Sequence, residues 1–314
     1  MGAKGVTAIR ELLAGATREL TAAGVPSPRF DAEELAASLL GVRRGELIAH
    51  PDLDDATLAA YRDLVQRRAQ REPLQHITGV AHFRHITVRV GPGVFIPRPE
   101  TEVVAGAAIE VAQKIAANGS VPTVVDLYAG SGAIAIAVAD EVPQAAVHAV
   151  EGDDAAARWL SRNAAGISGG RLHAHHEEVA ECADGVLRDI TGTVDVVVAN
   201  PPYIPEGAHI RDAEVAEHDP PPALWSGRDG LDAMRVLERT AARLLRPGGI
   251  AIAEHADVQG ESAPAVFAST GRWTDVADHA DWTDRPRYLT ASRALAPTAQ
   301  GTRGAVAASE QHDE

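Results

Sequence analysis

Residues 123–132 read TVVDLYAGSG and join a short apolar strand, Thr123 to Leu127, to a turn that contains two glycines. An apolar helical stretch, Ala133 to Val138, follows the turn. In an open α/β sheet, ligands bind at the carboxyl ends of the strands, where this turn is predicted to lie. Glycine lets the backbone approach a ligand closely and adopt conformations that side chains disfavour. The segment therefore predicts a Rossmann-like sheet with a ligand site after its first parallel strand.

The sequence beyond this segment alternates between strand and helix patterns. Further short apolar strands are predicted at Ala146 to Val150, Val194 to Ala199 and Gly249 to Glu254, with helix-length segments between them. Such alternation is typical of a parallel sheet that carries helices on both faces. Near the end, Asp275 to Trp282 and Arg287 to Arg293 are predicted to pair as antiparallel strands.

The sequence before this region has a different character. Apolar residues recur at helical spacing around Ile9 to Leu20, Asp31 to Leu40 and Leu58 to Val65, which predicts a small helical bundle. From Ile77 to Ile96 the pattern becomes alternating and glycine-containing, as in a β-hairpin. The predicted organisation is a helical domain at 1–75, a hairpin linker at 76–97, a sheet domain at 98–295 and a disordered tail at 296–314.

Composition limits the function classes. The chain has 314 residues, of which 45% are hydrophobic and 23% charged, with 44 acidic and 29 basic side chains and a net charge of −15. This balance argues against stable binding of long nucleic acids through phosphate contacts. The lone Cys182 excludes a disulfide framework and a cysteine-rich zinc module. No apolar run is long enough to span a bilayer and no signal peptide is evident, so we expect a cytoplasmic protein with no membrane partner.

The glycine turn is best explained by an adenosyl cofactor. Glu151 ends the second predicted strand, about twenty residues after the turn, where a carboxylate can accept hydrogen bonds from both ribose hydroxyls. A nicotinamide enzyme would normally show a third glycine, which is absent after Ala133. The acid that precedes the turn, Asp126, fits a cofactor with an amino-acid moiety better than a dinucleotide.

A second motif, Asn200-Pro201-Pro202-Tyr203, follows the strand Val194 to Ala199. The two prolines lack backbone donors and stiffen the turn, so the Asn200 side chain and the Pro201 carbonyl are free to accept hydrogen bonds. Such acceptors can hold an NH₂ group and aim its nitrogen lone pair. Tyr203 offers a flat face for stacking against a planar amide or base. A merely rigid turn is the simpler alternative, but the motif follows a strand of the same sheet as the glycine turn.

Other polar groups are given structural interpretations. His173, His175 and His176 lie on one strand, where adjacent side chains point to opposite faces, so no metal site is predicted. Cys182 has no evident base or partner and is expected to be structural. Glu254 and His255 end a strand near the site and are expected to shape it, without an assigned role as acid or base.

These residues resemble the peptide chain release factor glutamine methyltransferases, a branch of the class I S-adenosylmethionine-dependent methyltransferases. The resemblance runs from about residue 10 to 294. The Asn-Pro-Pro-Tyr motif alone is shared with enzymes that methylate exocyclic amines of nucleic-acid bases. The helical domain and residues 96–102, IPRPETE, single out the protein-glutamine branch. Residues 73–79, PLQHITG, residues 229–232, DGLD, and the pair Glu254-His255 also match.

The resemblance implies a role for each matching residue. It places the methionine end of S-adenosylmethionine against the turn, its ribose on Glu151, and Thr101 beside the methionine side. It implies that Asn200, Pro201 and Tyr203 are catalytic and that these residues and Pro202 hold the substrate amide, with Asn200 also touching the cofactor. The family usually has Gly at the position of Tyr128 and Asp at that of Glu151. The remaining implied cofactor contacts are Asp126, Tyr128, Ala129, Gly130, Ser131, Gly132, Glu178 and Val179, the last two beside the adenine.

The implied reaction is methylation of the glutamine amide nitrogen (N5) in the Gly-Gly-Gln motif of peptide chain release factors, with S-adenosylhomocysteine as the other product. The helical domain is expected to select the protein substrate. Its basic residues Arg62, Arg67, Arg68 and Arg71 are interpreted as solvated surface, with contact to a release factor or ribosomal RNA as the alternative. Three alternatives stay open: a ribosomal-protein glutamine methyltransferase, a nucleic-acid adenine-N6 or other exocyclic-amine methyltransferase, and a non-catalytic adenosyl-binding module.

Overall fold

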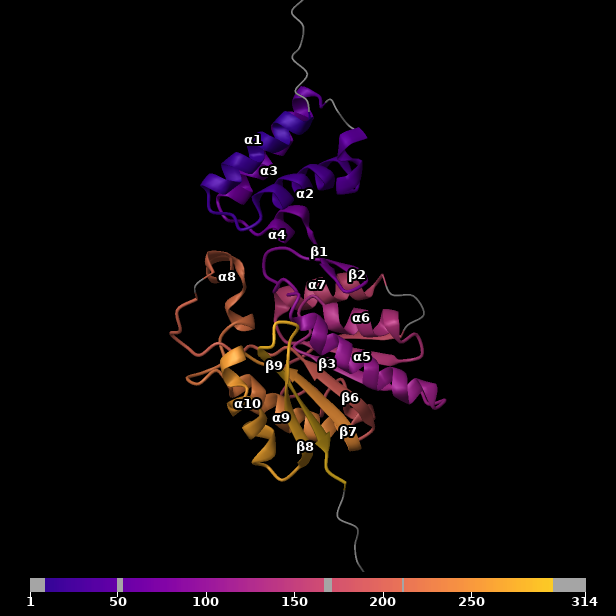
Figure 1. Ribbon diagram of the computed structural model, residues 1–314. Helices are drawn as coiled ribbons and strands as arrows, with labels where there is room; N and C mark the ends of the chain where they lie inside the picture. Colours follow the sequence, from indigo (N-terminus) through magenta and orange to yellow (C-terminus); the bar gives the residue numbers. More distant parts are fainter. Residues whose placement is uncertain (1–8, 50–52, 167–170, 211, 296–314) are drawn as a thin grey trace, which may run out of the picture.

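The computed structural model describes residues 9–49, 53–166, 171–210 and 212–295, and it places a helical bundle next to an α/β domain (Figure 1). The bundle core is formed by Leu20, Leu35, Tyr61 and Val65, all buried. Asp54 caps the N-terminus of the helix that begins at Asp55, because its side chain accepts a hydrogen bond from the Thr57 N–H at 2.8 Å. The helical elements are α1 (Ile9–Ala22), α2 (Pro28–Leu40), η1 (Arg44–Ala49), α3 (Asp55–Ala69) and α4 (Leu74–Thr78).

A two-stranded hairpin, β1 (Val80–Phe83) and β2 (Ile86–Arg89), connects the bundle to the sheet. The alternating pattern predicted strand from Ile77 onward, and this start was wrong. Ile77 lies in the short helix α4, which begins after Pro73 and ends where Gly79 adopts a left-handed conformation with φ of 77°. The predicted tail at 296–314 lies outside the described residues.

The central sheet has seven strands in the order β5-β4-β3-β6-β7-β9-β8. The first five strands of this order are parallel, and β9 is antiparallel to both of its neighbours. The order reverses at β3, whose neighbours are β4 and β6, and this reversal opens a crevice at the carboxyl ends of the strands. The predicted sheet is confirmed. Its strands are β3 (Thr123–Leu127), β4 (Ala146–Glu151), β5 (Leu172–His176), β6 (Val194–Ala199), β7 (Leu245–Glu254), β8 (Trp273–Ala280) and β9 (Pro286–Arg293).

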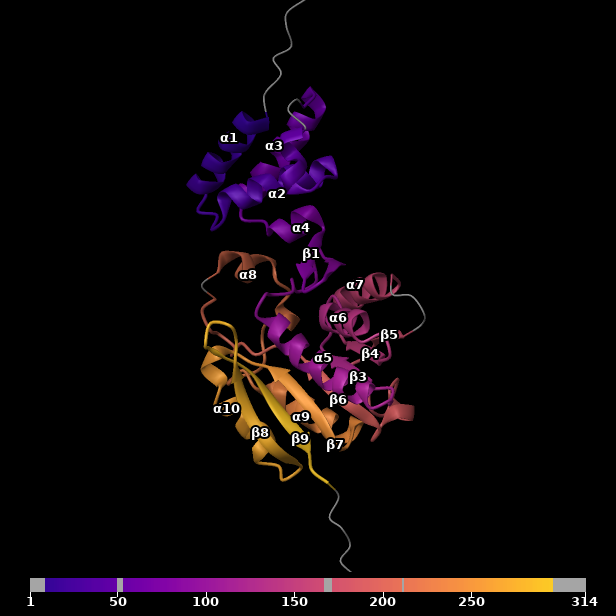
Figure 2. The ribbon, with the colours of Figure 1, turned by 45° about the vertical axis from the view of Figure 1, so that its right-hand side comes forward.

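Helices cover both faces of the sheet (Figure 2). On one face α5 (Thr101–Ala117), α6 (Ala133–Glu141) and α7 (Asp154–Ala164) pack with the hairpin against alternate strand residues such as Val124 and Val196. On the other face α9 (Asp232–Leu244) and α10 (Ser262–Ala268) pack against the intervening residues, such as Val125 and Val197. Strands buried on both faces explain why the sequence shows continuous apolar runs instead of alternation. Two single-turn elements, η3 (Arg188–Ile190) and η5 (Asp257–Gln259), lie in the connections.

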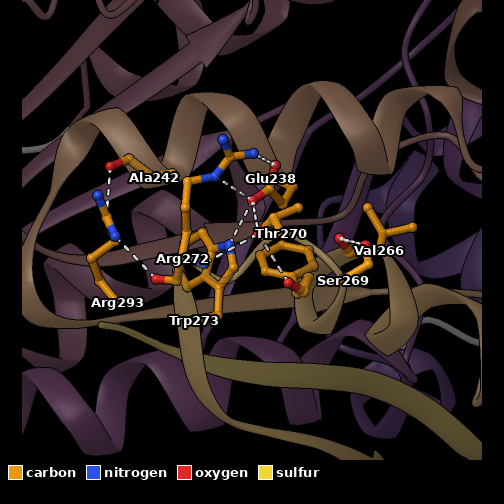
Figure 3. A network of polar contacts seen from close by, with 9 residues as sticks. Glu238, Ala242, Val266, Ser269, Thr270, Arg272, Trp273 and Arg293 are labelled. Carbon is orange, nitrogen blue, oxygen red and sulfur yellow. Dashed lines mark hydrogen bonds and ion pairs between the residues drawn. The ribbon is translucent and has the colours of Figure 1, made fainter. Parts of the chain in front are cut away.

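A buried carboxylate joins α9 to the last two strands (Figure 3). Glu238, which is 2% exposed, accepts hydrogen bonds from Trp273 Nε1 at 2.6 Å, Thr270 Oγ1 at 3.0 Å and Arg272 Nη2 at 2.6 Å. Burial alone would raise the pKa of Glu238, but these hydrogen bonds lower it below its ordinary value. Arg293 donates to the backbone carbonyls of Ala242 and Arg272, so β9 is also connected to α9 and to the residue that precedes β8.

The chain between β6 and α9 leaves the sheet and passes beneath the helical bundle (Figure 1). We call residues 212–224 of this connection the roof segment; it contains α8 (Ala213–His218) and η4 (Pro221–Ala223). Glu214 of α8 accepts hydrogen bonds from Arg68 at 2.8 Å and from Arg71 at 3.0 Å. Arg68 is 4% exposed and also donates to Asp31 at 2.7 Å.

These contacts correct the expectation for the basic stretch on α3. Arg67 pairs with Glu72, and Arg68 and Arg71 pair with Glu214, so three of the four arginines serve contacts within the molecule. Arg62 is exposed. Within the described ranges no helix is both long and apolar enough to cross a bilayer.

Candidate active site

A cavity of about 560 Å³ opens at the carboxyl ends of β3, β4 and β6. Its walls come from the glycine turn, the end of β4, the Asn-Pro-Pro-Tyr turn, the residues that lead into α5, and the roof segment. The lining residues are Phe95, Pro97, Arg98, Pro99, Glu100, Thr101, Tyr128, Ala129, Gly130, Ser131, Ala133, Ile134, Glu151, Asp153, Ala156, Asn200, Pro202, Tyr203, Ile204, Asp212, Val215, Pro220, Pro222, Ala223 and Leu224.

Glu151 connects the end of β4 to the glycine turn. One carboxylate oxygen accepts from the Gly130 N–H at 2.8 Å, and the other accepts from the Asp153 N–H at 2.8 Å. Burial raises the pKa of Glu151, although these two hydrogen bonds oppose the shift. A carboxylate has about four acceptor positions, so each oxygen can still accept from a hydroxyl in the cavity.

The two glycines of the turn serve different purposes. Both have positive φ, 57° at Gly130 and 85° at Gly132. A Cβ at Gly132 would lie 2.7 Å from Leu160 Cδ1, so this glycine permits close packing of α6 against α7. A Cβ at Gly130 would meet no atom within 4 Å, and this residue lines the cavity. Gly130 therefore keeps cavity volume open, whereas Gly132 lies behind the wall.

Tyr128 occupies a left-handed position with φ of 60°, a conformation in which glycine is ordinarily preferred. Its hydroxyl donates to the Ala233 carbonyl at 3.4 Å, and its ring packs against the apolar core beneath α9. Burial raises the pKa of this phenol. The side chain thus lines the cavity without displacing Gly130 or Glu151, and the turn tolerates the departure from glycine.

Asp126 is fully buried behind the turn and does not line the cavity. Its Oδ2 accepts from the Ala135 N–H at 3.0 Å, while Oδ1 has no partner among the described residues. Burial raises the pKa of Asp126 to about 8. Ser131 and Ala129 line the cavity, so the structure brings part of the predicted cofactor set together and leaves Asp126 and Gly132 in the layer behind it.

The predicted substrate-binding turn lies across the cavity from Glu151. Asn200 Nδ2 donates to Thr101 Oγ1 at 3.3 Å, which joins the end of β6 to the start of α5. Asn200, Pro202 and Tyr203 line the cavity, and Pro201 is buried beneath them. Burial raises the pKa of the Tyr203 phenol.

Two residues behind the Asn-Pro-Pro-Tyr turn, Gln259 and Gly230, hold it in place. Gln259 Nε2 donates to the carbonyls of Tyr203 at 3.2 Å and Gly230 at 3.3 Å. Gly230 has φ of 75°, and a Cβ there would lie 2.5 Å from the Tyr203 carbonyl oxygen. The Asp-Gly-Leu-Asp match gave a signal for Gly230. Nothing in the local sequence indicates Gln259.

Two predicted cofactor residues lie away from the cavity. Val179 is 2% exposed and belongs to the core beneath the sheet. The carboxylate of Glu178 lies over Gly152, so close that a Cβ at Gly152 would be 3.0 Å from it. Neither residue lines the cavity, and their contact with an adenine ring stays a prediction.

The roof segment was not identified from the sequence as part of the site. It contributes six lining residues, and its Asp219 accepts from Arg98 Nη2 at 2.6 Å. The sequence could have indicated this segment, because the stretch between the strand at 194–199 and the helix that begins at Asp232 is long for a connection within a sheet domain. Arg98 is the basic residue of the lining, against Glu100, Glu151, Asp153 and Asp212. The lining is therefore suited to a ligand that carries positive charge.

A cluster of histidines lies elsewhere, on β4 and β5. His148 stacks on His173 and His175 with ring centroids 4.8 Å and 5.3 Å apart. The sequence argument about side chains on one strand overlooked His148 on the neighbouring strand. In the part of the chain that the structure describes, no group of His, Cys, Asp and Glu is arranged to hold a metal ion. Cys182 is buried and donates to the Val179 carbonyl at 3.3 Å, as expected of a structural thiol.

Comparison with known proteins agrees with this architecture. Residues 11–79 match the model of the PrmC N-terminal domain, and residues 74–217 match the model of the family described as conserved hypothetical protein 95. The release factor glutamine methyltransferase of Streptomyces coelicolor is 52% identical over 285 residues, which cover 90% of this chain and 97% of that protein.

Two other relatives are also similar along nearly their whole length. The release factor glutamine methyltransferase of Mycolicibacterium smegmatis is 47% identical, over 92% of this chain and 99% of its own. The 4-amino-L-phenylalanine/4-methylamino-L-phenylalanine methyltransferase of Streptomyces pristinaespiralis is 40% identical, over 93% and 98%. On the strength of the higher identities, the chain belongs to the release factor glutamine methyltransferase family.

Proposed function

We propose that this protein transfers a methyl group from S-adenosylmethionine to the side-chain amide nitrogen of the glutamine in the Gly-Gly-Gln motif of a peptide chain release factor. The observation that carries the proposal is the pairing of Asn200 with Thr101, because an Asn200 amide that donates to Thr101 turns its oxygen toward other partners. Relatives with this activity in their names, up to 52% identical over nearly their full length, support it.

The residues of the cavity fit an adenosyl sulfonium cofactor. Gly130 leaves the space that a Cβ would fill, Glu151 presents a partly buried carboxylate to ribose hydroxyls, and the acidic lining suits a cation. S-adenosylmethionine supplies a methyl group on positively charged sulfur, and S-adenosylhomocysteine is the product. Glu151 would hold the ribose, and Tyr128 to Ser131 would lie along the methionine end. Asp126 would stabilise this turn from behind.

The chain's own contribution to the chemistry is orientation of a poor nucleophile. An amide nitrogen is weakly nucleophilic because its lone pair is delocalised into the carbonyl. Asn200 Oδ1 and the Pro201 carbonyl would accept the two N–H groups and aim the nitrogen at the methyl group, while Tyr203 stacks on the amide plane. The contribution is positional and electrostatic, and no general base is assigned.

The helical domain, residues 1–75, is proposed to select the protein substrate, with residues 76–97 as linker and 98–295 as the catalytic domain. Support comes from the ion pairs of Glu214 with Arg68 and Arg71, because they connect the bundle to a wall of the cavity. A protein bound to the bundle would therefore lie next to the opening. Since release factors act on cytoplasmic ribosomes, this function places the enzyme in the cytoplasm.

The decisive experiment is transfer of a tritiated methyl group to a purified release factor, followed by peptide mapping. We expect label on the glutamine of Gly-Gly-Gln and none on a release factor in which that glutamine is alanine. Parallel reactions contain ribosomal proteins, an adenine-containing DNA duplex, and 4-amino-L-phenylalanine, the substrate class in the name of one relative. Label only in one of these parallel reactions would replace the proposed substrate with that acceptor.

A further inference from the structure

Gln259, the last residue of η5, has a buried side-chain amide behind the Asn-Pro-Pro-Tyr turn. The residue is 5% exposed and does not line the cavity. Its Nε2 donates to the backbone carbonyls of Tyr203 at 3.2 Å and Gly230 at 3.3 Å, and its Oε1 accepts from the Ala256 N–H at 3.0 Å. Ala256 lies just after the end of β7. The side chain therefore connects the turn to the central sheet.

The three contacts fix the direction of the Gln259 amide. Backbone carbonyls can only accept hydrogen bonds, and a backbone N–H can only donate. The NH₂ group must therefore face Tyr203 and Gly230, and the oxygen must face Ala256. Both N–H bonds of the NH₂ group are used, one for each carbonyl. A glutamate of nearly the same shape would set carboxylate oxygens against two carbonyl oxygens, so the position requires a donor and an acceptor in one side chain.

Gly230 allows this amide to reach the turn. Gly230 has φ of 75°, and a Cβ there would lie 2.5 Å from the Tyr203 carbonyl oxygen and 2.9 Å from Gln259 Nε2. Both distances are shorter than van der Waals contact, so any side chain at residue 230 would push the carbonyl and the amide apart.

The same place joins the two ends of the connection that carries the roof segment. The Ile204 N–H donates to the Leu224 carbonyl at 2.8 Å, and the Ser226 N–H donates to the Ile204 carbonyl at 2.9 Å. The chain on either side of this pairing carries the two carbonyls that Gln259 binds. The Asn-Pro-Pro-Tyr turn and the base of the roof segment thus meet at one amide.

We infer that Gln259 is a positioning residue for methyl transfer, because its amide holds the Asn-Pro-Pro-Tyr turn by the Tyr203 carbonyl. The inference rests on the proposed function, in which Asn200 Oδ1 and the Pro201 carbonyl accept the two N–H groups of the substrate amide. The rings of Pro201 and Pro202 restrict the backbone that leads to Tyr203, so the turn moves as a unit. When the Tyr203 carbonyl is released, both hydrogen-bond acceptors shift away from the substrate nitrogen.

The test measures single-turnover methylation of the release factor with cofactor saturating. Gln259→Glu keeps the size of the side chain but loses the donor, and Gln259→Met loses both polar groups without adding charge. Each should slow transfer on the order of 10-fold to 100-fold, as a small misplacement of reacting groups does. The cofactor Kd, measured by calorimetry, should stay unchanged, because the proposed adenosyl contacts lie on the glycine turn and Glu151.

Two control variants separate positioning from charge and from stability. Gln113 is exposed and donates to the Glu141 carbonyl at 3.4 Å, so Gln113→Glu makes the same change elsewhere and should keep the wild-type rate. The Thr191 hydroxyl lies 2.9 Å and 3.2 Å from two backbone carbonyls and does not line the cavity. Thr191→Val should lower the melting temperature without slowing transfer. If Gln259→Met behaved like Thr191→Val, the role of Gln259 would be purely structural and the inference would be overturned.

Gly230→Ala disturbs the same contact from the other side and should slow transfer to a similar extent. Because both changes act on one contact, the double variant Gly230→Ala, Gln259→Met should be no slower than the slower single variant. Losses that multiply would show that the two residues act independently, against the inference.

A readout without methyl transfer separates this inference from the proposed function. Tyr203-Ile204 is the only Tyr-Ile pair in the sequence, so protein made with carbonyl-¹³C tyrosine and ¹⁵N isoleucine gives one amide peak that correlates with the Tyr203 carbonyl. The ¹³C shift of this carbonyl should change in Gln259→Met and Gln259→Glu and stay in Gln113→Glu. A carbonyl resonance that is insensitive to Gln259 would overturn the inference even if the rates fell. A wild-type protein that leaves the release factor unlabelled, while its carbonyl peak responds to Gln259 as expected, would overturn the proposed function and support the contact.

Discussion

Arg68 and Glu214, which are 146 residues apart in the sequence, are joined by a 2.8 Å hydrogen bond that connects the helical bundle to the roof of the cavity. The same carboxylate oxygen accepts from Arg71 at 3.0 Å, and Arg68 also pairs with the buried Asp31. One acid on a six-residue helix thus holds a cavity wall against the helical domain, which contributes no residue to the cavity lining itself.

Glu214→Gln should weaken this connection and lower the free energy of unfolding by about 1 to 3 kcal/mol, because a buried arginine loses one of its two acids. The release-factor KM should rise more than the cofactor Kd, because the proposed cofactor contacts lie on the glycine turn and Glu151 and not on the roof segment. Glu33→Gln, which removes an exposed pair with Arg29, is the control and should change neither value. Equal KM values for Glu214→Gln and wild type would show that the connection does not act on the substrate.

Glu151→Ala should weaken S-adenosylmethionine binding by about 1 to 3 kcal/mol, the cost of leaving hydrogen bonds to a charged group unmade. Two effects combine, because the variant loses the ribose contact and frees the Gly130 N–H that Glu151 holds. Isothermal calorimetry measures the change, with Glu110→Ala as a surface control. An unaltered Kd would place the ribose elsewhere.

Gly130 and Gly132 form a matched pair for separating binding from stability. Gly132→Ala should lower the free energy of unfolding by about 1 to 3 kcal/mol, because the residue combines φ of 85° with a Cβ only 2.7 Å from Leu160. Gly130→Ala meets no atom and should be less destabilising, but its methyl group occupies cavity space and should weaken cofactor binding. Denaturant unfolding measures the stability of both variants, and calorimetry measures their cofactor affinity. If Gly130→Ala were the less stable variant, or Gly132→Ala the weaker cofactor binder, the prediction would be wrong.

Asn200→Ala should reduce turnover on the order of 10² to 10³-fold, because one of two aimed acceptors is lost. Asn200→Asp keeps an acceptor oxygen but adds negative charge, so partial activity at most is expected. Cofactor affinity should fall less than turnover in both variants, since the adenosyl contacts are proposed to lie mainly on the first strands. Single-turnover rates that match the wild type would leave the Asn-Pro-Pro-Tyr turn with a purely structural role.

The histidine stack on β4 and β5 predicts a loss of stability in acid. Burial and the neighbouring His175 and His173 lower the pKa of His148 from 6.5 to about 4. Between these pH values the unfolded chain binds a proton that the folded chain excludes, so the free energy of unfolding falls as the pH drops from 6.5 toward 4.

The contribution of this half-buried ring should be on the order of 1 kcal/mol after solvent screening. His148→Phe keeps an aromatic ring in the stack without a titrating group. The free energy of unfolding, measured by chemical denaturation at several pH values, should therefore fall less steeply with decreasing pH in His148→Phe than in wild type. An equal fall in both proteins would assign the acid sensitivity to other groups.

The sequence identified those parts of the molecule that depend on local patterns. The strand at 194–199 was predicted to the residue, because strands buried on both faces carry uninterrupted apolar runs. The predicted start of the hairpin was wrong, because Ile77 is compatible with a strand as well as with a helix. Pro73 before α4 and the left-handed Gly79 after it limit a short helix at this position.

The parts that were missed depend on tertiary contacts. Asn200 and Thr101 are 99 residues apart, and no local pattern indicates that the two side chains meet. The roof segment has no apolar periodicity, and its position follows from ion pairs with α3. Gln259 acts through a single amide on a one-turn element, which leaves no trace in composition or spacing.

The position of the roof segment between β6 and α9 has an evolutionary consequence. Its residues belong to no strand of the sheet, so insertions, deletions and substitutions there leave strand register and the glycine turn intact. Sequence changes in the roof segment can therefore reshape one wall of the cavity without altering the strands that position Glu151 and Asn200.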